Sequence, residues 1–228
     1  MTRSIMVVAA HPDDEVLGCG GSIAKYTESG SDVHVVFLAD GVLSRKKSNQ
    51  TGVDALEVRR LAAKKACKIL GVKSVSFEEF PDNRLDTVSL LDLTQVIEGY
   101  INKHKPECIF THHSGDLNVD HRLVHEAVMT ACRPQVGQSV KSILCFEVAS
   151  STEWRSPSSH NGFSPNWFID ISESLEKKVL ALEAYKIEMR NWPHPRSIKA
   201  IRHLAHWRGA TIGVDAASLG MSRSVVAS

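Results

Sequence analysis

The chain of 228 residues is long enough to bury a sizeable core, and its length favours one large domain spanning residues 1–228. Apolar residues make up 43% and charged residues 23% of the chain, proportions that are typical of a folded globular protein and unlike those of a disordered one. The 27 basic and 26 acidic residues give a net charge of +1, so no overall electrostatic field favours binding to nucleic acid or anionic lipid.

Strands and helices alternate along the first part of the chain. We predict short apolar strands at residues 5–10, 33–38, 75–77 and 108–111, and helices at residues 15–26, 54–70, 90–103 and 120–132. This β-α-β-α order predicts the α/β class, with a mostly parallel sheet that is covered by helices on both faces.

The last third of the chain is less regular. Further strands are predicted at residues 142–148 and 167–171, separated by a turn-rich run at 155–165 that we expect to form a mobile loop. Ser172 is expected to cap a long amphipathic helix. Its apolar residues recur at helical spacing: Leu175, Val179, Leu182, Tyr185 and Met189. The tail after Gly213 is weakly patterned, and we assign it no element.

A histidine and three acids follow the first predicted strand, in the stretch VVAAHPDDEVLGCGG at residues 7–21. In an open parallel sheet the ligand crevice lies beyond the carboxyl ends of the strands, which is where this run begins. His11 and Asp14 are three residues apart across a turn stiffened by Pro12, so an imidazole and a carboxylate can point to one place. The competing interpretation is that Asp13 or Asp14 only caps the following helix.

A second cluster rich in histidine and acid, THHSGDLNVDHRLVHEA at residues 111–127, follows the strand at 108–111. Because the carboxyl ends of parallel strands share one edge, this cluster falls at the same edge of the predicted sheet as the first. Asp120 is a suitable N-cap, which puts His121 on the first turn of the next helix, facing the crevice.

The two clusters together supply a candidate metal site. His11, Asp14 and His121 form a set of two histidines and one carboxylate, which suits Zn²⁺ with a fourth position open for water. His125, one helical turn after His121, is a rival ligand. Each histidine taken alone is more simply explained as an ordinary surface or core residue.

The glycine cluster GCGG at residues 18–21 has two interpretations. It resembles part of a dinucleotide-binding turn, but the three acids that come first would repel a pyrophosphate. We therefore expect these glycines to allow close packing of the first helix against the sheet.

With these clusters, the sequence resembles the LmbE-like (PIG-L) family of zinc-dependent de-N-acetylases. The match covers most of residues 4–213 and includes AHPDDEVLGCGG, VHVVFLADG, the pattern R-x-x-A-x-x-x-A-x-x-x-L-G at residues 59–71, FPDNRLD, and a box that ends in VDHR. The resemblance implies a Rossmann-like three-layer sandwich. It also implies removal of an acetyl group from an N-acetylated amino sugar of the N-acetylglucosamine type, or from its conjugate.

The resemblance further implies roles for individual residues. The ligands of Zn²⁺ are then His11, Asp14 and His121. Asp13 is the general base, and Arg59 and Asp82 match positions that commonly hold sugar hydroxyls.

One departure from the family pattern concerns the oxyanion. The second box of the family often reads H-P-D-H, and its first histidine, which helps to stabilise the oxyanion, is replaced here by Asn118. Either the amide of Asn118 or a histidine from elsewhere, such as His194 in WPHPRS, is then the expected donor. The spacing of the box suggests that Asp120 holds the group at position 118, so Asp120 is also a catalytic candidate.

Other functions stay open at this point. The same fold can carry an amidase of a thiol-sugar conjugate, and GCGG at a helix N-terminus can belong to a non-catalytic sugar-nucleotide binding module. A Mg²⁺ phosphohydrolase is disfavoured, because Mg²⁺ prefers oxygen ligands to histidine. The expected partner is a small N-acetylated sugar or glycoconjugate.

The sequence also predicts where the protein acts. The N-terminus enters an apolar strand without the pattern of a signal peptide, and no apolar run approaches the ~18 residues that suggest a membrane span. Five scattered cysteines without a C-x-x-C pair indicate reduced thiols. We therefore expect a cytoplasmic protein. Its oligomeric state is open, and in a homo-oligomer a loop from a neighbouring subunit can complete the site.

Overall fold

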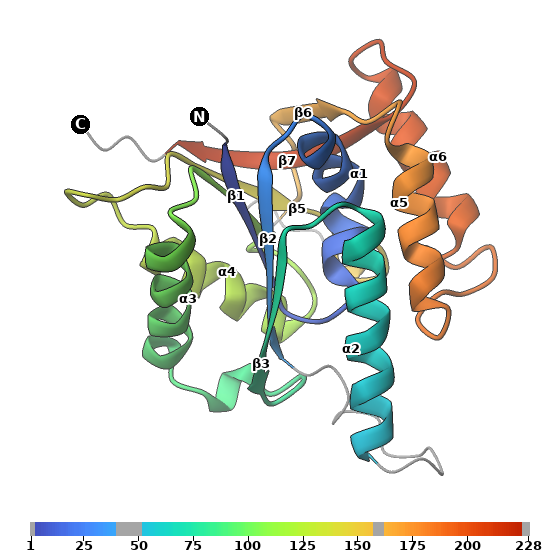
Figure 1. Ribbon diagram of the computed structural model, residues 1–228. Coiled ribbons are helices and arrows are strands. Elements are labelled where there is room, and N and C mark those ends of the chain that lie inside the picture. Colours follow the sequence, from blue (N-terminus) through green and yellow to red (C-terminus); the bar gives the residue numbers. More distant parts are fainter. Residues whose placement is uncertain (1–2, 40–51, 157–161, 225–228) are drawn as a thin grey trace.

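The computed structural model describes residues 3–39, 52–156 and 162–224, which form a three-layer α/β sandwich (Figure 1). The strands are β1 (Ser4–Ala9), β2 (Asp32–Ala39), β3 (Ser74–Phe80), β4 (Cys108–His112), β5 (Ser142–Phe146), β6 (Trp167–Asp170) and β7 (Ala217–Ser224). The α-helices are α1 (Asp14–Glu28), α2 (Gly52–Ile69), α3 (Leu90–His104), α4 (Val119–Ala131), α5 (Leu175–Leu182) and α6 (Ile198–Ala210). Across these ranges, no helix is both long and apolar enough to cross a membrane.

The seven strands form one sheet in the order β3-β2-β1-β4-β5-β7-β6. Strands β1 to β5 are parallel, and β7 lies antiparallel between β5 and β6. The chain proceeds from β1 through β2 to β3 on one side, and from β4 to β5 on the other. The carboxyl ends of β1 and β4 therefore flank the point where the strand order reverses, which is where open α/β sheets bind ligands.

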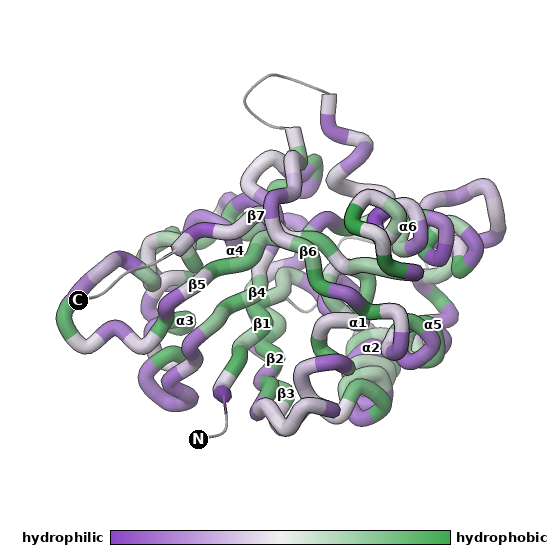
Figure 2. The backbone as a smooth tube through the Cα atoms, turned by 90° about the horizontal axis from the view of Figure 1, so that it is seen from above, coloured by the Kyte–Doolittle hydropathy of each residue, from purple (hydrophilic) through white to green (hydrophobic). Residues whose placement is uncertain are grey.

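Helices cover both faces of the sheet and bury its central strands (Figure 1). Helices α3 and α4 lie on one face, and α1, α2, α5 and α6 lie on the other. Successive residues of β1 point to opposite faces and are almost all buried, as in a parallel strand that is covered on both sides. Apolar residues accordingly concentrate along the inner strands (Figure 2).

The structure confirms the predicted α/β class and corrects the C-terminal third. The long helix expected after Ser172 begins only at Leu175 and ends at Leu182, where the one-turn 3-10 helix η3 (Glu183–Tyr185) follows. Ser172 does not cap it: Ser174 occupies the N-cap position, and the hydroxyl oxygen of Ser172 accepts instead from the backbone N–H of Ala216 at 3.2 Å.

One α-helix and one strand were not predicted at all. Helix α6 and strand β7 follow one another near the C-terminus, and β7 lies in the tail to which the sequence assigned no element. Of the loop expected at 155–165, residues 157–161 lie outside the described residues, as does the loop that follows β2 in VHVVFLADG.

The glycines of GCGG pack α1 against its neighbours, which confirms the packing interpretation. A Cβ atom at Gly18 would lie 2.2 Å from Cδ2 of Phe146 on β5. A Cβ atom at Gly21 would lie 2.6 Å from Cδ1 of Ile171. Both distances are far too short for real contacts, so these positions need glycine for close approach.

Replacement of Gly18 by alanine tests this packing. We expect Gly18→Ala to lower the free energy of unfolding by about 1–3 kcal/mol, because the new methyl group overlaps the buried Phe146 ring. Gly99→Ala on α3 is the matched control: its Cβ meets nothing within 4 Å, so it should raise stability by about 0.5–1 kcal/mol. Urea denaturation measures both. Equal effects of the two substitutions would contradict the packing role.

Candidate active site

Asp14 is held at the carboxyl end of β1 by the turn that precedes α1. The backbone N–H of His11 donates to Oδ2 of Asp14 at 2.9 Å, and Nδ1 of His11 lies 3.3 Å from the same oxygen. Both side chains are buried. The predicted turn therefore brings the imidazole and the carboxylate to one place.

His121 reaches the same carboxylate from the first turn of α4. Its Nε2 lies 3.2 Å from Oδ2 of Asp14, and its Nδ1 lies 3.1 Å from Oδ1 of Asp116. Burial alone would lower the pKa of His121, but the charges of Asp14 and Asp116 raise it to about 9. A carboxylate on the second nitrogen of a histidine is the usual way to orient a metal ligand.

Asp116 is itself held in place by the chain around it. Its Oδ2 accepts a hydrogen bond from Thr152 Oγ1 at 2.6 Å, and its Oδ1 accepts from the backbone N–H of Asn118 at 2.9 Å and from the hydroxyl of Ser151. Asp116 therefore connects the start of α4 with the segment after β5, and it fixes the ring of His121.

Asn118, and not Asp120, caps helix α4. Oδ1 of Asn118 accepts from the backbone N–H of Asp120 at 2.8 Å, so the N-cap predicted for Asp120 is wrong by two residues. Asp120 instead accepts from the backbone N–H groups of Asn83 and Leu85, at 2.6 and 3.0 Å. It thereby ties the loop after β3 to the site.

His11 also contacts two further acids through its other ring nitrogen. Nε2 of His11 lies 2.9 Å from Oδ2 of Asp120 and 3.1 Å from Oδ1 of Asp82. Burial would lower the pKa of His11, but hydrogen bonds to Asp120, Asp14 and Asp82 raise it well above its usual value. His11 therefore contacts Asp14 through one ring nitrogen and the pair of Asp82 and Asp120 through the other.

Asp13 adopts a backbone conformation that residues other than glycine rarely occupy, with φ at 121°. Its Oδ2 accepts a hydrogen bond from Nη1 of Arg196 at 2.8 Å. Burial raises the pKa of Asp13 to about 6, although the guanidinium of Arg196 opposes this rise. Strained backbone of this kind is concentrated at functional sites.

A polar cavity of about 150 Å³ joins these residues. Leaving aside the rival ligand His125, seven of the nine candidate residues line it: His11, Asp13, Asp14, Arg59, Asp82, Asn118 and His121. Four further lining residues were missed: Asn83, Ser150, Ser151 and Arg196. Asn83 lies in the stretch FPDNRLD and Arg196 lies in WPHPRS, whereas no local pattern marks the two serines.

Two of the nine candidates do not line the cavity. Asp120 is fully buried beneath it and contacts His11. His194 lies beside the cavity lining and not in it: its Nδ1 accepts from the backbone N–H of Arg196 at 3.0 Å, and its ring packs edge-on against Trp154. The WPHPRS segment therefore brings a guanidinium to the cavity instead of the expected imidazole.

The donor set at this edge of the sheet fits a zinc ion. His11, Asp14 and His121 can each offer a ligand atom, all within 4.8 Å of one another, and His11, Asp82 and Asp120 form a second such group. Only the first group has the two nitrogen donors that Zn²⁺ favours. Oδ1 of Asp14 is buried without a hydrogen-bond partner among the described residues, as expected of an oxygen atom that binds a cation.

His125, the rival ligand, is engaged elsewhere. Its Nδ1 lies 2.9 Å from the carbonyl oxygen of His112, and it belongs to neither group of possible ligands among the described residues. His125 therefore packs α4 against β4.

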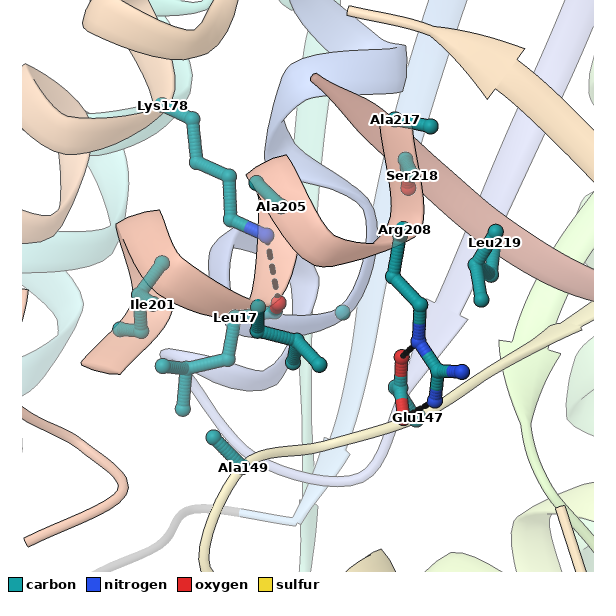
Figure 3. A pocket seen from close by; sticks show the side chains of 12 residues that line it. Leu17, Glu147, Ala149, Lys178, Ile201, Ala205, Arg208, Ala217, Ser218 and Leu219 are labelled. Atoms are coloured by element: carbon teal, nitrogen blue, oxygen red, sulfur yellow. Dashed lines mark hydrogen bonds and ion pairs between the residues drawn. The ribbon is translucent and has the colours of Figure 1, made fainter. Parts of the chain in front are cut away.

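A second pocket of about 30 Å³ lies between α1, α5, α6 and β7 (Figure 3). Arg208 pairs there with Glu147 at 2.9 Å, and Nζ of Lys178 donates to the carbonyl oxygen of Leu17 at 2.8 Å. The cavity at the carboxyl ends of β1 and β4 is larger and carries the histidines and acids, so we assign the candidate active site to it.

The chain is similar in sequence to known proteins. The sequence model of the PIG-L family, described as GlcNAc-PI de-N-acetylase, matches residues 6–132. The uncharacterized deacetylase YaiS of Escherichia coli is 30% identical over 190 residues, which cover 81% of this chain and 91% of that protein. The 4-oxalmesaconate hydratase of Pseudomonas putida is 29% identical over 211 residues, which cover 84% and 76%.

A solved structure extends the likeness to the whole fold. The N,N'-diacetylchitobiose deacetylase from Pyrococcus horikoshii matches with a TM-score of 0.80 and 19% identity, over 97% of this chain and 84% of that one. The likeness therefore includes the C-terminal third, which lies beyond the residues that the family model matches.

Removal of one imidazole tests the metal site. His121→Ala should lose stoichiometric zinc, because His121 offers one of the two nitrogen donors close to Asp14. His125→Ala is the matched control on the same helix and should keep one zinc ion per chain. Elemental analysis after dialysis measures both. Full zinc occupancy in the His121→Ala protein would contradict the assignment of His121 as a ligand.

Proposed function

Because the chain belongs to the PIG-L family, we propose that it is a zinc-dependent hydrolase that removes the acetyl group from an N-acetylated amino sugar or its conjugate. The observation that carries this proposal is the group of His11, Asp14 and His121 beside a cavity to which the carboxylate of Asp13 contributes. Such a group, with an adjacent acid outside the ligand set, is what metal-assisted amide hydrolysis requires.

The lining of the cavity supports a neutral substrate that is rich in hydroxyl groups. Both arginines of the lining already contact carboxylates: Arg59 pairs with Glu188, and Arg196 pairs with Asp13. An anionic substrate would have to compete with these carboxylates, whereas sugar hydroxyls can bind to carboxylates, amides and guanidinium groups alike. Arg59 and Asp82 are the residues that we propose for this contact.

In the proposed reaction, His11, Asp14 and His121 hold the metal. When bound, a zinc ion supplies Lewis acidity: it polarises a carbonyl group and lowers the pKa of a water molecule. Asp13 accepts a proton from the attacking water as the new C–O bond forms and then returns it to the amide nitrogen, after which the C–N bond breaks and acetate and the free amine are released. Arg196 donates to Oδ2 of Asp13 and so keeps this carboxylate in place.

Asn118 is the residue that we propose as the neutral donor to the substrate oxygen on which negative charge develops. Its Oδ1 is engaged in capping α4, which orients the amide, and its Nδ2 donates to Oδ1 of Asn83 at 3.1 Å. Both asparagines line the cavity. Arg196, and not His194, is the cation that the WPHPRS segment contributes there. The carboxylate of Asp120 supports the site from outside the cavity, because it contacts Nε2 of His11 and accepts from the backbone N–H groups of Asn83 and Leu85.

Hydration is the second candidate function, because a relative at 29% identity is named a hydratase. An amidase of a thiol-sugar conjugate would use the same site and differ in the group that it releases. The sugar-nucleotide binding module loses its main support, since Phe146 and Ile171 fill the space beside the glycines of GCGG.

The direct test is acetate release by the zinc-loaded protein from a panel of N-acetylated sugars and conjugates. Asp13→Asn should keep the zinc and lower kcat about 10²–10⁴-fold, because an amide cannot accept the proton of water. Asp86→Asn, a surface acid on the 3-10 helix after β3, is the matched control and should leave kcat unchanged.

Two outcomes would contradict the proposed function. One is a set of equal kcat values for Asp13→Asn and the parent protein at equal zinc content. The other is no acetate from any member of the panel, together with addition of water to an unsaturated carboxylate, which would favour the hydratase.

Two substitutions distinguish the proposed donor of Asn118, its Nδ2, from its capping oxygen, Oδ1. Asn118→Ser keeps a capping oxygen and removes Nδ2, so we expect kcat to fall about 10²-fold with little change in KM or melting temperature. Asn118→Ala should also lose about 1 kcal/mol of stability, because the cap of α4 is gone. Steady-state kinetics and thermal melts measure the two effects. A kcat for Asn118→Ser within twofold of the parent would rule out the amide as the donor.

A further inference from the structure

Two buried polar side chains of the segment from α5 to η3 contact the first turn of α1. Oη of Tyr185 donates to Oε1 of Glu15 at 2.6 Å. Nζ of Lys178 donates to the carbonyl oxygen of Leu17 at 2.8 Å, and Figure 3 shows this second contact. Tyr185 and Lys178 are 1% and 7% exposed. They lie outside residues 6–132, the part that the family model matches.

The contact from Tyr185 continues to the backbone of Asp13. Glu15 is fully buried, and while Tyr185 binds its Oε1, its Oε2 accepts from the backbone N–H of Asp13 at 3.0 Å. Asp13 has the strained φ of 121°, which persists only where the surroundings enforce it. The carboxyl group of Glu15 is thus a bridge between the phenol of Tyr185 and a strained peptide.

The contact from Lys178 supports the same turn at its other end. Helix α1 is broken at Cys19, whose φ of −135° and ψ of 19° are not helical. Leu17 lies two residues before this break, where a regular ladder of helical hydrogen bonds is disturbed. The ammonium group of Lys178 supplies a donor to its carbonyl oxygen and so fixes the end of the short first turn.

We propose that Tyr185 and Lys178 are positioning residues, which hold the first turn of α1 so that Asp13 keeps its place beside the cavity. This inference rests on the proposed function of Asp13 as the base. Asp14 does not depend on these contacts in the same way, because the backbone of His11 and the ring of His121 hold its carboxylate directly. Loss of the two contacts should therefore displace Asp13 and leave metal binding intact.

The main test compares Tyr185→Phe with Tyr100→Phe. Tyr100 is a matched control, because its Oη donates to Oε1 of Glu78 at the same distance of 2.6 Å, on α3 and β3. We expect Tyr185→Phe to lower kcat about 10- to 100-fold at unchanged KM and zinc content, since small displacements of a reacting group have effects of this size. Tyr100→Phe should stay within twofold of the parent.

Lys178→Met and Lys177→Met form the second pair. Lys177 is the preceding residue and is partly exposed, where its Nζ pairs with Glu28 at the surface. Lys178→Met should lower kcat in the same manner as Tyr185→Phe, and Lys177→Met should not. Loss of zinc together with kcat in either test variant would indicate a general structural role and overturn the proposal.

Amide hydrogen exchange gives a readout that does not depend on activity. In the peptide that covers residues 10–17, Tyr185→Phe should speed exchange at least tenfold, whereas Tyr100→Phe should leave it unchanged. Glu15→Gln should preserve protection, because a carboxamide can still accept from Asp13 and donate to Tyr185. If the parent releases no acetate, the proposed function fails, and the exchange data still decide on the contacts. Unchanged exchange and unchanged kcat in Tyr185→Phe would overturn the proposed positioning role of Tyr185.

Discussion

The arrangement of the site depends on the contacts of one buried carboxylate, that of Asp14. Its Oδ2 lies within 3.3 Å of the backbone N–H of His11, Nδ1 of His11 and Nε2 of His121, and its Oδ1 has no partner among the described residues. A buried carboxylate is costly unless a cation compensates it. Burial alone would raise the pKa of Asp14, but the charge of His121 and the hydrogen bonds from His11 and His121 lower it well below its usual value. The site is thus built to keep a negative charge and to place a cation beside it.

The rest of the site surrounds this charge in layers. Asp116 orients His121, and Asp120 orients His11 while it fixes the loop that carries Asp82. The parallel sheet makes this possible, because β1 and β4 are neighbours and both end at the point where the strand order reverses. Asp13 then occupies the cavity side of the same turn, and its strained backbone is the feature that most needs support from elsewhere in the fold.

The sequence predicted the parts of the site that follow from local pattern. Alternating strands and helices predicted a parallel sheet, and the sheet alone explains why His11 and His121, far apart in the chain, meet at one edge. The close packing of GCGG also followed, since acids precede the glycines. The N-cap of α4 did not: Asn118 and Asp120 are both good capping residues, and in the structure the carboxylate of Asp120 contacts His11 and the loop after β3 instead. Arg196 was missed for a similar reason. It contacts Asp13 from 183 positions away, and no local pattern distinguishes it from His194.

Anomalous diffraction at the zinc absorption edge, from crystals of the zinc-loaded protein, can locate the metal relative to Asp14. We expect one strong peak bounded by His11, Asp14 and His121, next to the cavity that Asp13 lines. A peak bounded instead by His11, Asp82 and Asp120, or no peak at this edge of the sheet, would contradict this expectation, because Asp14 would then not be the ligand around which the site is organised.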